Sequence, residues 1–392
     1  MSLPTLADLD GIDGAKVLTR LDLNVPIADG VVQDDTRITA ALPTLRWLVE
    51  RAGLVAACSH LGKAKGTPDP AFSLEPVVPV LSEALGREVR FVPDCLEANP
   101  ADHPQGTLLL LENLRFYPGE KANDPEFAAR LTDGFSHYVN DAFGTAHRDH
   151  GSVSAAARRF DRHHKAAGFL MEREVAALSR LVDAPEQPFV AVVGGAKVST
   201  KTAPLEALLD RVTTLLIGGG MANTFFKALG RAVGRSLVED EMLDTARTVM
   251  DRAADRGIAL LLPTDVVVAD SIDHPSRIEV VAADAVPADL MIVDLGPDSR
   301  ARYAEALAPA KTVFWNGPMG VFEVDDFAAG TLAVAEALAD CPGFTVVGGG
   351  ESVMAIRRAG VVDRVSHVST GGGASLSFLT GDQLPALAAL EE

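Results

Sequence analysis

Short apolar runs alternate along the chain with segments whose apolar residues recur every three or four positions. The runs are four to six residues long, which is typical of buried strands, and the segments between them have the spacing of amphipathic helices. In the first half, strands are predicted at 16–21, 54–58, 89–92, 107–111 and 137–140, and helices at about 38–52, 76–85 and 125–131. This alternation predicts parallel strands joined by helical crossovers.

A helix is predicted at 168–183, near the middle of the chain. Met171, Val175, Leu178 and Val182 form one apolar stripe on it, and Pro185 follows its end. The alternation then resumes, with strands at 189–193, 213–217, 259–262, 291–295, 312–315 and 344–347 and helices that include 239–256 and 331–340. The predicted fold class is α/β, with two doubly wound parallel-sheet (Rossmann-like) domains joined by the helix at 168–183.

Size and composition agree with two folded domains. A chain of 392 residues is long for one hydrophobic core, and 47% hydrophobic with 23% charged residues is typical of a folded, soluble protein. The formal net charge of −19 excludes a nucleic-acid partner, because binding to a phosphate backbone needs a basic face. We expect no membrane partner either, since no apolar run is long enough to span a bilayer.

The three cysteines, Cys58, Cys95 and Cys341, lie far apart in the sequence. An odd number of scattered cysteines argues against a disulfide framework and against a zinc site. Together with an N-terminus that has no basic and apolar leader, they predict a cytoplasmic protein. Cys58 lies within an apolar run and is interpreted as a core residue rather than a nucleophile.

Polar clusters follow the predicted strands, where ligands bind in parallel α/β sheets. In the first half these clusters are cationic with hydrogen-bonding neighbours: Asp22 and Asn24, His60 and Lys63, Arg115, and His147 with Arg148. In the second half they are rich in glycine and carry two lysines: 194–197 and Lys201, 218–220, 316–318, 348–351 and 371–373. The first half is suited to a small multivalent anion, and the second to a nucleotide whose phosphates contact backbone amides.

Each of these residues also has a simpler interpretation. A single arginine is as often a solvated surface charge, and a single glycine triplet more often makes a tight turn. It is the repeated placement at strand ends that favours binding.

Several familiar motifs are missing. The chain has no G-x-x-x-x-G-K-[ST] and no G-x-G-x-x-G, so it is neither a P-loop enzyme nor a dinucleotide dehydrogenase of the usual kind. The triplet His147, Arg148, Asp149 matches a protein-kinase motif, but the asparagine and DFG that should follow are absent. The pairs His163 with His164 and His147 with His150 have no cysteine or carboxylate partner at metal-binding spacing, so they are interpreted as solvated or structural histidines.

Seven segments together resemble the phosphoglycerate kinase family, in order and over the whole chain. They are 20–26 (RLDLNVP), 59–62 (SHLG), 111–116 (LENLRF), 140–148 (NDAFGTAHR), 194–198 (GGAKV), 315–323 (WNGPMGVFE) and 369–375 (STGGGAS). The resemblance implies a monomeric two-domain enzyme with a hinge. It implies reversible phosphoryl transfer between 1,3-bisphosphoglycerate and ADP, giving 3-phosphoglycerate and ATP in glycolysis or gluconeogenesis, with Mg²⁺.

The same resemblance implies domain and residue roles. The triose phosphate would bind to a domain at 1–167, on which the segment 377–392 packs; 168–183 would connect it to a nucleotide-binding domain at 184–376. The implied triose-phosphate ligands are Asp22, Leu23, Asn24, Arg37, His60, Leu61, Gly62, Lys63, Arg115 and Arg148. The implied nucleotide ligands are Lys201, Gly317, Glu323, Gly349, Gly350, Glu351 and Ser352, and the implied catalytic groups are Arg37, Lys197, Lys201, Gly372 and Gly373.

The chain departs from the family's pattern in two places. Lys63 and Ala64 stand where the family usually has Arg-Pro, and Glu351 stands where the family's metal-binding residue is usually Asp. Lysine keeps the charge but loses the bidentate fork of arginine, so we expect looser triose binding. Glu351 is the implied metal ligand, with a carboxylate moved by one methylene. Two alternatives stay open: a homologue that binds both ligands without turnover, and another two-domain enzyme of sugar or acyl phosphates.

Overall fold

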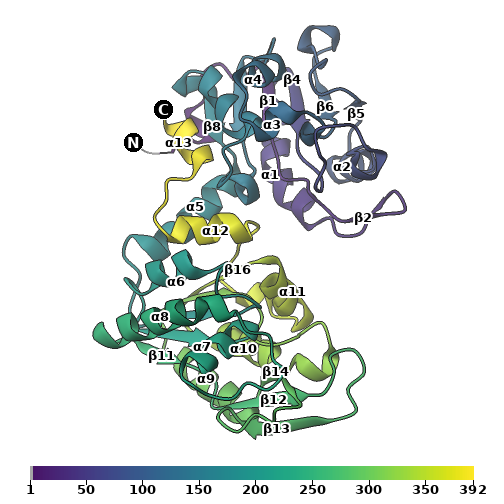
Figure 1. Ribbon diagram of the computed structural model, residues 1–392. Coiled ribbons are helices and arrows are strands. Elements are labelled where there is room, and N and C mark those ends of the chain that lie inside the picture. The colour runs from purple at the N-terminus through teal and green to yellow at the C-terminus, as the bar shows by residue number, and fades with distance from the viewer. Residues whose placement is uncertain (1–2) are drawn as a thin grey trace. The chain divides into compact units, whose positions relative to one another are not determined.

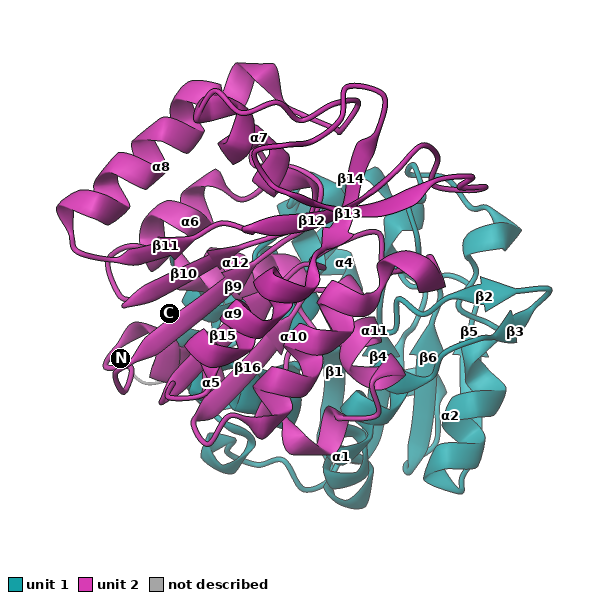
Figure 2. Cartoon of the chain, turned by 90° about the horizontal axis from the view of Figure 1, so that it is seen from below, with its two compact units in different colours: residues 1–176, 383–392 teal, residues 177–382 magenta. Residues whose placement is uncertain are grey.

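The computed structural model describes residues 3–392 and contains two compact units (Figure 2). Unit 1 takes the described residues up to Ala176 together with Gln383–Glu392, and unit 2 is Ala177–Asp382. The predicted helix near the middle of the chain is present as α5 (Phe169–Val182), and the division between the units falls within it. The binding roles and boundaries given to the two domains above stay predictions.

Unit 1 is built on a six-stranded parallel sheet in the order β5-β6-β4-β1-β7-β8 (Figure 1). Its strands are β1 (Lys16–Arg20), β4 (Leu54–Cys58), β5 (Val89–Val92), β6 (Thr107–Leu111), β7 (His137–Asn140) and β8 (Lys165–Ala167), and its helices include α1 (Thr36–Arg51), α2 (Val77–Leu85), α3 (Pro118–Lys121) and α4 (Pro125–Leu131). β1 is the switch point: β4, β6 and β5 lie on one side of it, and β7 and β8 on the other.

Unit 2 repeats this plan with the order β11-β10-β9-β15-β16-β17, again all parallel. The strands are β9 (Phe189–Val193), β10 (Thr214–Ile217), β11 (Ala259–Leu261), β15 (Thr312–Asn316), β16 (Phe344–Gly348) and β17 (His367–Val368). Figure 2 shows α6 (Thr202–Leu208), α7 (Gly220–Ala228) and α8 (Leu243–Asp255) on one face of the sheet, with α9 (Pro297–Leu307), α10 (Ala329–Asp340) and α11 (Gly350–Arg358) on the other. The predicted α/β fold class is confirmed.

One predicted strand belongs to a different sheet from the one expected. Residues 291–295 form β14 (Met291–Leu295), which pairs antiparallel with β12 (Asp265–Ala269), and β12 pairs antiparallel with β13 (Ile278–Ala282). β13 is an edge strand with Ile278 and Val280 exposed. An exposed edge strand such as β13 does not give the continuous buried run from which strands were predicted. β12 is buried throughout and does give such a run at 266–269, which the sequence analysis did not assign.

Smaller elements connect or close these layers. β2 (Ile27–Ala28) and β3 (Val31–Val32) form a hairpin, and α12 (Gly372–Leu379) and α13 (Pro385–Glu391) end the chain. Short helical turns occur at η1 (Leu6–Asp8), η2 (Pro70–Phe72), η3 (Pro100–Asp102), η4 (Leu114–Phe116), η5 (Phe143–Thr145), η6 (Gly151–Ala155), η7 (Ala157–Arg159), η8 (Arg162–His164), η9 (Asp240–Met242), η10 (Asp325–Phe327) and η11 (Val362–Arg364).

α13 is held within unit 1 by cations at its C-terminal end. Lys165 Nζ donates to the carbonyl of Ala389 at 2.8 Å, and Arg162 Nη1 donates to the carbonyl of Glu391 at 3.0 Å. The last carbonyls of a helix have no partner within it and carry partial negative charge, so cations are the favoured partners there. The chain therefore returns to the unit in which it begins.

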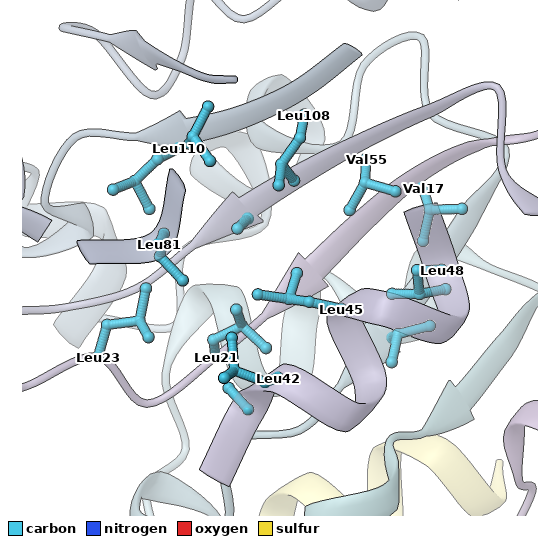
Figure 3. Packing of buried hydrophobic residues seen from close by; sticks show 14 of the residues in the cluster. Val17, Leu21, Leu23, Leu42, Leu45, Leu48, Val55, Leu81, Leu108 and Leu110 are labelled. Carbon is cyan, nitrogen blue, oxygen red and sulfur yellow. The ribbon is translucent and has the colours of Figure 1, made fainter. Parts of the chain in front are cut away.

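The core of unit 1 lies between α1 and the parallel strands (Figure 3). Leu42, Leu45 and Leu48 of α1 point towards the strands that carry Val17 and Val55. Leu45 and Leu48 are fully buried. Because parallel strands are covered by helices, both sheets supply the near-continuous apolar runs seen in the sequence.

We predict that Leu45→Ala destabilises unit 1 by about 2–5 kcal/mol, because truncation of a fully buried leucine leaves a cavity that its neighbours fill only in part. Urea unfolding followed by circular dichroism measures the change. Val31→Ala is the matched control, since Val31 is 60% exposed, and it should change the free energy of unfolding by less than about 0.5 kcal/mol. Equal stability of the Leu45→Ala variant and the wild type would contradict this description of the core.

Candidate active site

In unit 1 the register of three neighbouring strands brings the predicted residues to one edge. Arg20, the last residue of β1, stands opposite Cys58 of β4 and Asn140 of β7. The segments that follow these strands therefore leave the sheet side by side at its carboxyl edge, where parallel α/β sheets bind ligands.

Asp22 and Asn24 organise the loop after β1. Asp22 is buried, and both of its oxygens accept hydrogen bonds from Arg37 Nη1, at 2.9 and 2.8 Å. Asn24 Oδ1 accepts the backbone N–H of Gly62 at 2.8 Å, which ties this loop to the loop after β4. Arg37 itself, on the first turn of α1, keeps 35% of its side chain exposed. Its guanidinium is therefore fixed by Asp22 and still accessible.

His60 is buried and uncharged at neutral pH. Its Nδ1 lies 3.2 Å from Nη2 of Arg20, and because a guanidinium only donates, Nδ1 accepts and the ring proton is on Nε2. Burial lowers the pKa of His60 well below its usual value, and the charges of Arg20, Arg115, Arg148 and Arg37 lower it further. Four arginines therefore lie close enough to act on this ring, and Arg20 contacts it directly.

Arg115 has guanidinium nitrogens left without a partner. Nη1 donates to the carbonyl of Gly62 at 2.5 Å, whereas Nε and Nη2 are buried and have no hydrogen-bond acceptor. Burial lowers the pKa of Arg115 to about 10, and the charges of Arg148 and Arg20 act in the same direction. Arg115 is still protonated at neutral pH, so an anion would relieve both the missing hydrogen bonds and the repulsion.

The other predicted residues of this edge differ in their exposure to solvent. Leu23 and Leu61 are buried, and their backbone N–H groups donate to Ser59 Oγ and Asn113 Oδ1. These leucines contribute packing and a fixed backbone. Lys63, in contrast, is exposed; it lies two residues after Leu61, in the loop that follows β4.

Sequence reasoning gave no role to Asn113, although it lies within one of the quoted segments. Its Oδ1 accepts the N–H groups of Leu61 and Arg115 at 3.2 and 3.0 Å, and its Nδ2 donates to the carbonyls of Leu61 and Phe72 at 2.9 Å each. One buried carboxamide thus joins the loop that carries His60 to the turn that carries Arg115. An asparagine directly after a buried strand was the available signal.

In unit 2 the strand register again assembles the site, here from backbone. Asn316 of β15 stands opposite Val193 of β9 and Gly348 of β16, so Gly317 and the glycines after β9 and β16 meet at the carboxyl edge. Gly317 has φ +96°, and a Cβ on it would lie 2.4 Å from both the carbonyl oxygen of Gly194 and Nζ of Lys201. Only glycine fits this position.

Lys201 is enclosed by these loops. Its Nζ donates to the carbonyls of Gly194 and Asn316 at 2.6 and 2.9 Å. Burial lowers the pKa of Lys201 to about 8, and the charge of Glu351 opposes that shift, which places Glu351 near the ammonium group. Lys197, four residues earlier on the same loop, is exposed.

Two helices of unit 2 begin at glycines of the predicted site. α11 begins at Gly350, after Gly349 with φ +93°, and α12 begins at Gly372 and Gly373. The first turns of helices leave N–H groups free for an anion. Ser352 is different, because its buried Oγ accepts the N–H of Gly317 at 2.6 Å. Its side chain therefore fixes the loop of Gly317.

A cavity of about 430 Å³ opens beside these loops, entirely within unit 2. Its walls are mainly apolar and backbone, and they include Gly195, Gly219, Gly220, Leu237, Pro318, Met319 and Val321. Glu323 and Glu351 are exposed carboxylates on its lining. A slot of this size with a few polar groups at one side is typical of small-molecule sites.

Asp294, which also lines the cavity, was not predicted. Its Oδ2 accepts the N–H of Gly330 at 2.7 Å, and a Cβ on Gly320 or Gly330 would come within 2.4 or 2.3 Å of Oδ1. Burial raises the pKa of Asp294 to about 6, although the N–H of Gly330 opposes the shift. This side chain is hydrogen-bonded to the start of α10 and packs closely against Gly320.

Comparison with known proteins identifies the family. The sequence profile described as phosphoglycerate kinase matches residues 6–382. The chain is 50% identical to the cytosolic phosphoglycerate kinase of Triticum aestivum, over 100% of this chain and 98% of that protein. It is 48% identical to the chloroplastic phosphoglycerate kinase of Volvox carteri, over 97% of this chain and 84% of that protein.

The chain belongs to the phosphoglycerate kinase family. The solved structure of phosphoglycerate kinase from Coxiella burnetii superimposes with a TM-score of 0.89 at 42% identity, covering 100% of this chain and 99% of that one. The resemblance inferred from seven short segments is therefore confirmed. So is the predicted activity, reversible phosphoryl transfer between 1,3-bisphosphoglycerate and ADP, which is the glycolytic reaction of the family. Among the described residues, no helix is long and apolar enough to cross a membrane.

Proposed function

We propose that this chain carries out magnesium-dependent phosphoryl transfer with its two substrates held on separate units. The triose phosphate binds at the carboxyl edge of the unit 1 sheet, and the nucleotide binds at that of unit 2. The observation that carries the proposal is Arg115: two of its buried guanidinium nitrogens have no acceptor, beside an uncharged His60 and three further arginines.

The cationic edge of unit 1 suits 3-phosphoglycerate, which has a phosphate at one end and a carboxylate at the other. Arg37, Arg115 and Arg148 supply guanidinium groups that bind such oxygens bidentately. His60 donates from Nε2, and Asp22 and Asn24 act as acceptors for the substrate hydroxyl and as supports for the loop. Gly62 and Lys63, which follow the buried Leu61, complete this edge, and the buried Leu23 supports it.

The cavity of unit 2 suits a nucleotide. Its apolar walls accept a base, and the carboxylate of Glu323 is suited to the ribose hydroxyls. Lys201 and the N–H groups at Gly349, Gly350, Gly372 and Gly373 supply positive charge for phosphate oxygens. The hydrogen bond from the N–H of Gly317 to Ser352 Oγ fixes the loop beside these phosphate-binding groups.

Transfer from the acyl phosphate needs no general base. An oxygen of the ADP β-phosphate attacks phosphorus, the bond from phosphorus to the acyl oxygen breaks, and the product carboxylate leaves with the electron pair. Catalysis then depends on in-line alignment and on neutralising the charge of the transferring group. Arg37, Lys197, Lys201 and the amides at Gly372 and Gly373 are suited to that work.

Because the two ligand sets are on different units, the reaction requires the units to close around both substrates and exclude water. We assign the bending to α5 (Phe169–Val182) and to the segment 369–370, where the chain passes towards α12. Closure is needed only if the triose phosphate binds to unit 1 and the nucleotide binds to unit 2.

Magnesium fits the carboxylates of unit 2 as a metal bound mainly through the nucleotide. Among the described residues there is no group of three or more His, Cys, Asp or Glu side chains that could hold a metal ion. Mg²⁺ in kinase sites is usually bound by one or two carboxylates and by substrate phosphates, so a single exposed Glu351 on the cavity lining is sufficient. When bound, the ion would neutralise phosphate charge.

We expect a cytoplasmic monomer. The three cysteines are free, in agreement with a reducing compartment, and the wheat relative is named cytosolic while the Volvox relative is named chloroplastic. The second candidate is a homologue that binds both ligands without turnover, and the departure at Glu351 is the observation that favours it.

The allocation of ligands predicts opposite kinetic effects for two variants. ATP-dependent phosphorylation of 3-phosphoglycerate should proceed with Mg²⁺ and stop without it. Arg115→Met should raise KM for 3-phosphoglycerate about tenfold or more and leave KM for ATP almost unchanged, whereas Glu323→Ala should do the reverse. Arg90→Met, an exposed residue of the edge strand β5, is the control.

An Arg115→Met variant with raised KM for ATP alone would overturn the allocation. A wild-type chain that binds both ligands by calorimetry but gives no turnover would favour the second candidate.

Lys63→Arg restores the residue usual in the family and should tighten triose binding. We predict that KM for 3-phosphoglycerate falls about two- to fivefold, because a planar fork replaces a single ammonium group. Steady-state kinetics at saturating ATP measures it, with exposed Lys65→Arg as the control. An unchanged KM for Lys63→Arg would show that this side chain does not contact the substrate.

Glu351→Asp should change the magnesium requirement. The shorter side chain withdraws the carboxylate by one methylene, so we predict that the Mg²⁺ concentration for half-maximal activity shifts by about threefold or more. Glu336→Asp, an exposed residue of α10 that does not line the cavity, is the control. Superimposable magnesium titrations of Glu351→Asp and the wild type would remove Glu351 from the metal site.

A further inference from the structure

Glu239 is a buried carboxylate of unit 2 that lies outside the sites described so far. It directly precedes η9 and is only 8% exposed. Its Oε2 accepts the N–H of Ser199 at 3.1 Å, and its Oε1 accepts the hydroxyl of Ser199 at 2.5 Å. A buried carboxylate with charge-assisted hydrogen bonds of this kind is among the stronger polar anchors in a protein.

Further contacts place Glu239 beside the lysine loop, which is defined here as residues 194–201. Burial raises the pKa of Glu239, but hydrogen bonds from Ser199 and the N–H of Val198, with the charge of Lys197, outweigh burial and lower it overall. Glu239 is therefore ionised at neutral pH. Its own N–H donates to Thr224 Oγ1 of α7 at 3.2 Å, which fixes its position in the fold.

The ends and the middle of the lysine loop are anchored differently. The N–H groups of Gly194 and Gly195 donate to the carbonyls of Asn316 and Pro318, so the start of the loop is held by the segment after β15. Lys201 Nζ donates to the carbonyl of Asn316 and to that of Gly194 within the loop itself. The residues directly after Lys197 are instead held by Glu239.

We propose that Glu239 is a positioning residue that fixes the backbone directly after Lys197 and so directs the Lys197 ammonium group towards the transferring phosphoryl group. This inference rests on the role given to Lys197 under the proposed function. The carboxylate bonds to the loop rather than to a substrate, and its negative charge attracts the exposed lysine. Removing the carboxylate leaves Lys197 in the chain but frees the segment that carries it.

Glu239→Gln keeps the size of the side chain and removes its charge and one of its two acceptor oxygens. We predict that kcat falls about tenfold or more while KM for 3-phosphoglycerate and for ATP stays within about twofold, because misplacement of a group that acts on the transition state lowers kcat selectively. Glu241→Gln, an exposed residue of η9 two positions away, is the matched control and should keep wild-type kinetics.

A double-mutant cycle with Lys197→Ala separates positioning from a general loss of structure. If Glu239 acts through Lys197, Glu239→Gln lowers kcat in the wild-type background and has no further effect in Lys197→Ala. Ser199→Ala, which removes only the hydroxyl bond, should give a smaller loss of kcat that disappears in the Glu239→Gln background. Circular dichroism of each variant confirms folding before kinetics.

Two results would overturn the inference: an unchanged kcat in Glu239→Gln, or an equal fold-loss with and without Lys197. A Lys197→Ala variant with wild-type kcat has a different meaning, because the role of Lys197 under the proposed function would then fail. If Glu239→Gln does not fold, Ser199→Ala against Lys197→Ala provides the same comparison, and additive losses there would contradict the inference.

Discussion

Repulsion among like charges governs the carboxyl edge of the unit 1 sheet. Arg20, Arg37, Arg115 and Arg148 all lie near His60, in a chain whose overall charge is −19. Among the described residues, Arg37 is the one member of this group that forms an ion pair, with Asp22. His60 stays neutral because it is buried and because these charges oppose its protonation, and the remaining positive charge is available for an anion. Much of the local architecture, including the carboxamide of Asn113, keeps these side chains in place despite that repulsion.

Unit 2 also presents positive charge for an anion, but mainly from backbone N–H groups. Its sheet presents backbone N–H groups and close glycine loops, with Lys201 held between two carbonyls. Glycine is required where Gly317 faces Gly194 and Lys201, because any Cβ would occupy the place of the ammonium group. Backbone groups cannot rotate away as side chains can. The carboxyl edge of the unit 2 sheet is therefore kept rigid by the main chain and receives its charge from a few side chains. The two units thus share a strand plan but divide the chemistry between arginine side chains and backbone amides.

Much of this fold could be predicted from the sequence. Strands such as β4 and β9 are buried on both faces, and their continuous apolar runs were sufficient to place them. The edge strand β13 was missed because alternate residues of it are exposed and it lacks that signal, whereas its buried partner β12 carries the signal and was not assigned. Clusters at strand ends gave most of the candidate residues, since polar side chains directly after a buried strand are visible in one dimension.

The supporting residues were harder to find. Arg20, Asn113 and Glu239 act on groups that are distant in the sequence, or through backbone atoms that a sequence does not display. Asp294 is similar, because its burial depends on the close approach of Gly320 and Gly330. Sequence patterns thus gave the candidate ligand-binding residues, whereas only the folded structure indicates what holds those residues in position.

The central claim is that each unit carries half of the site and that the halves must close together. Small-angle X-ray scattering tests it most directly, with 3-phosphoglycerate alone, magnesium ADP alone, and both ligands in the non-reacting ternary complex. The account predicts that the radius of gyration falls when both ligands are bound, by more than with either ligand alone. An unchanged radius of gyration with both sites saturated would contradict it.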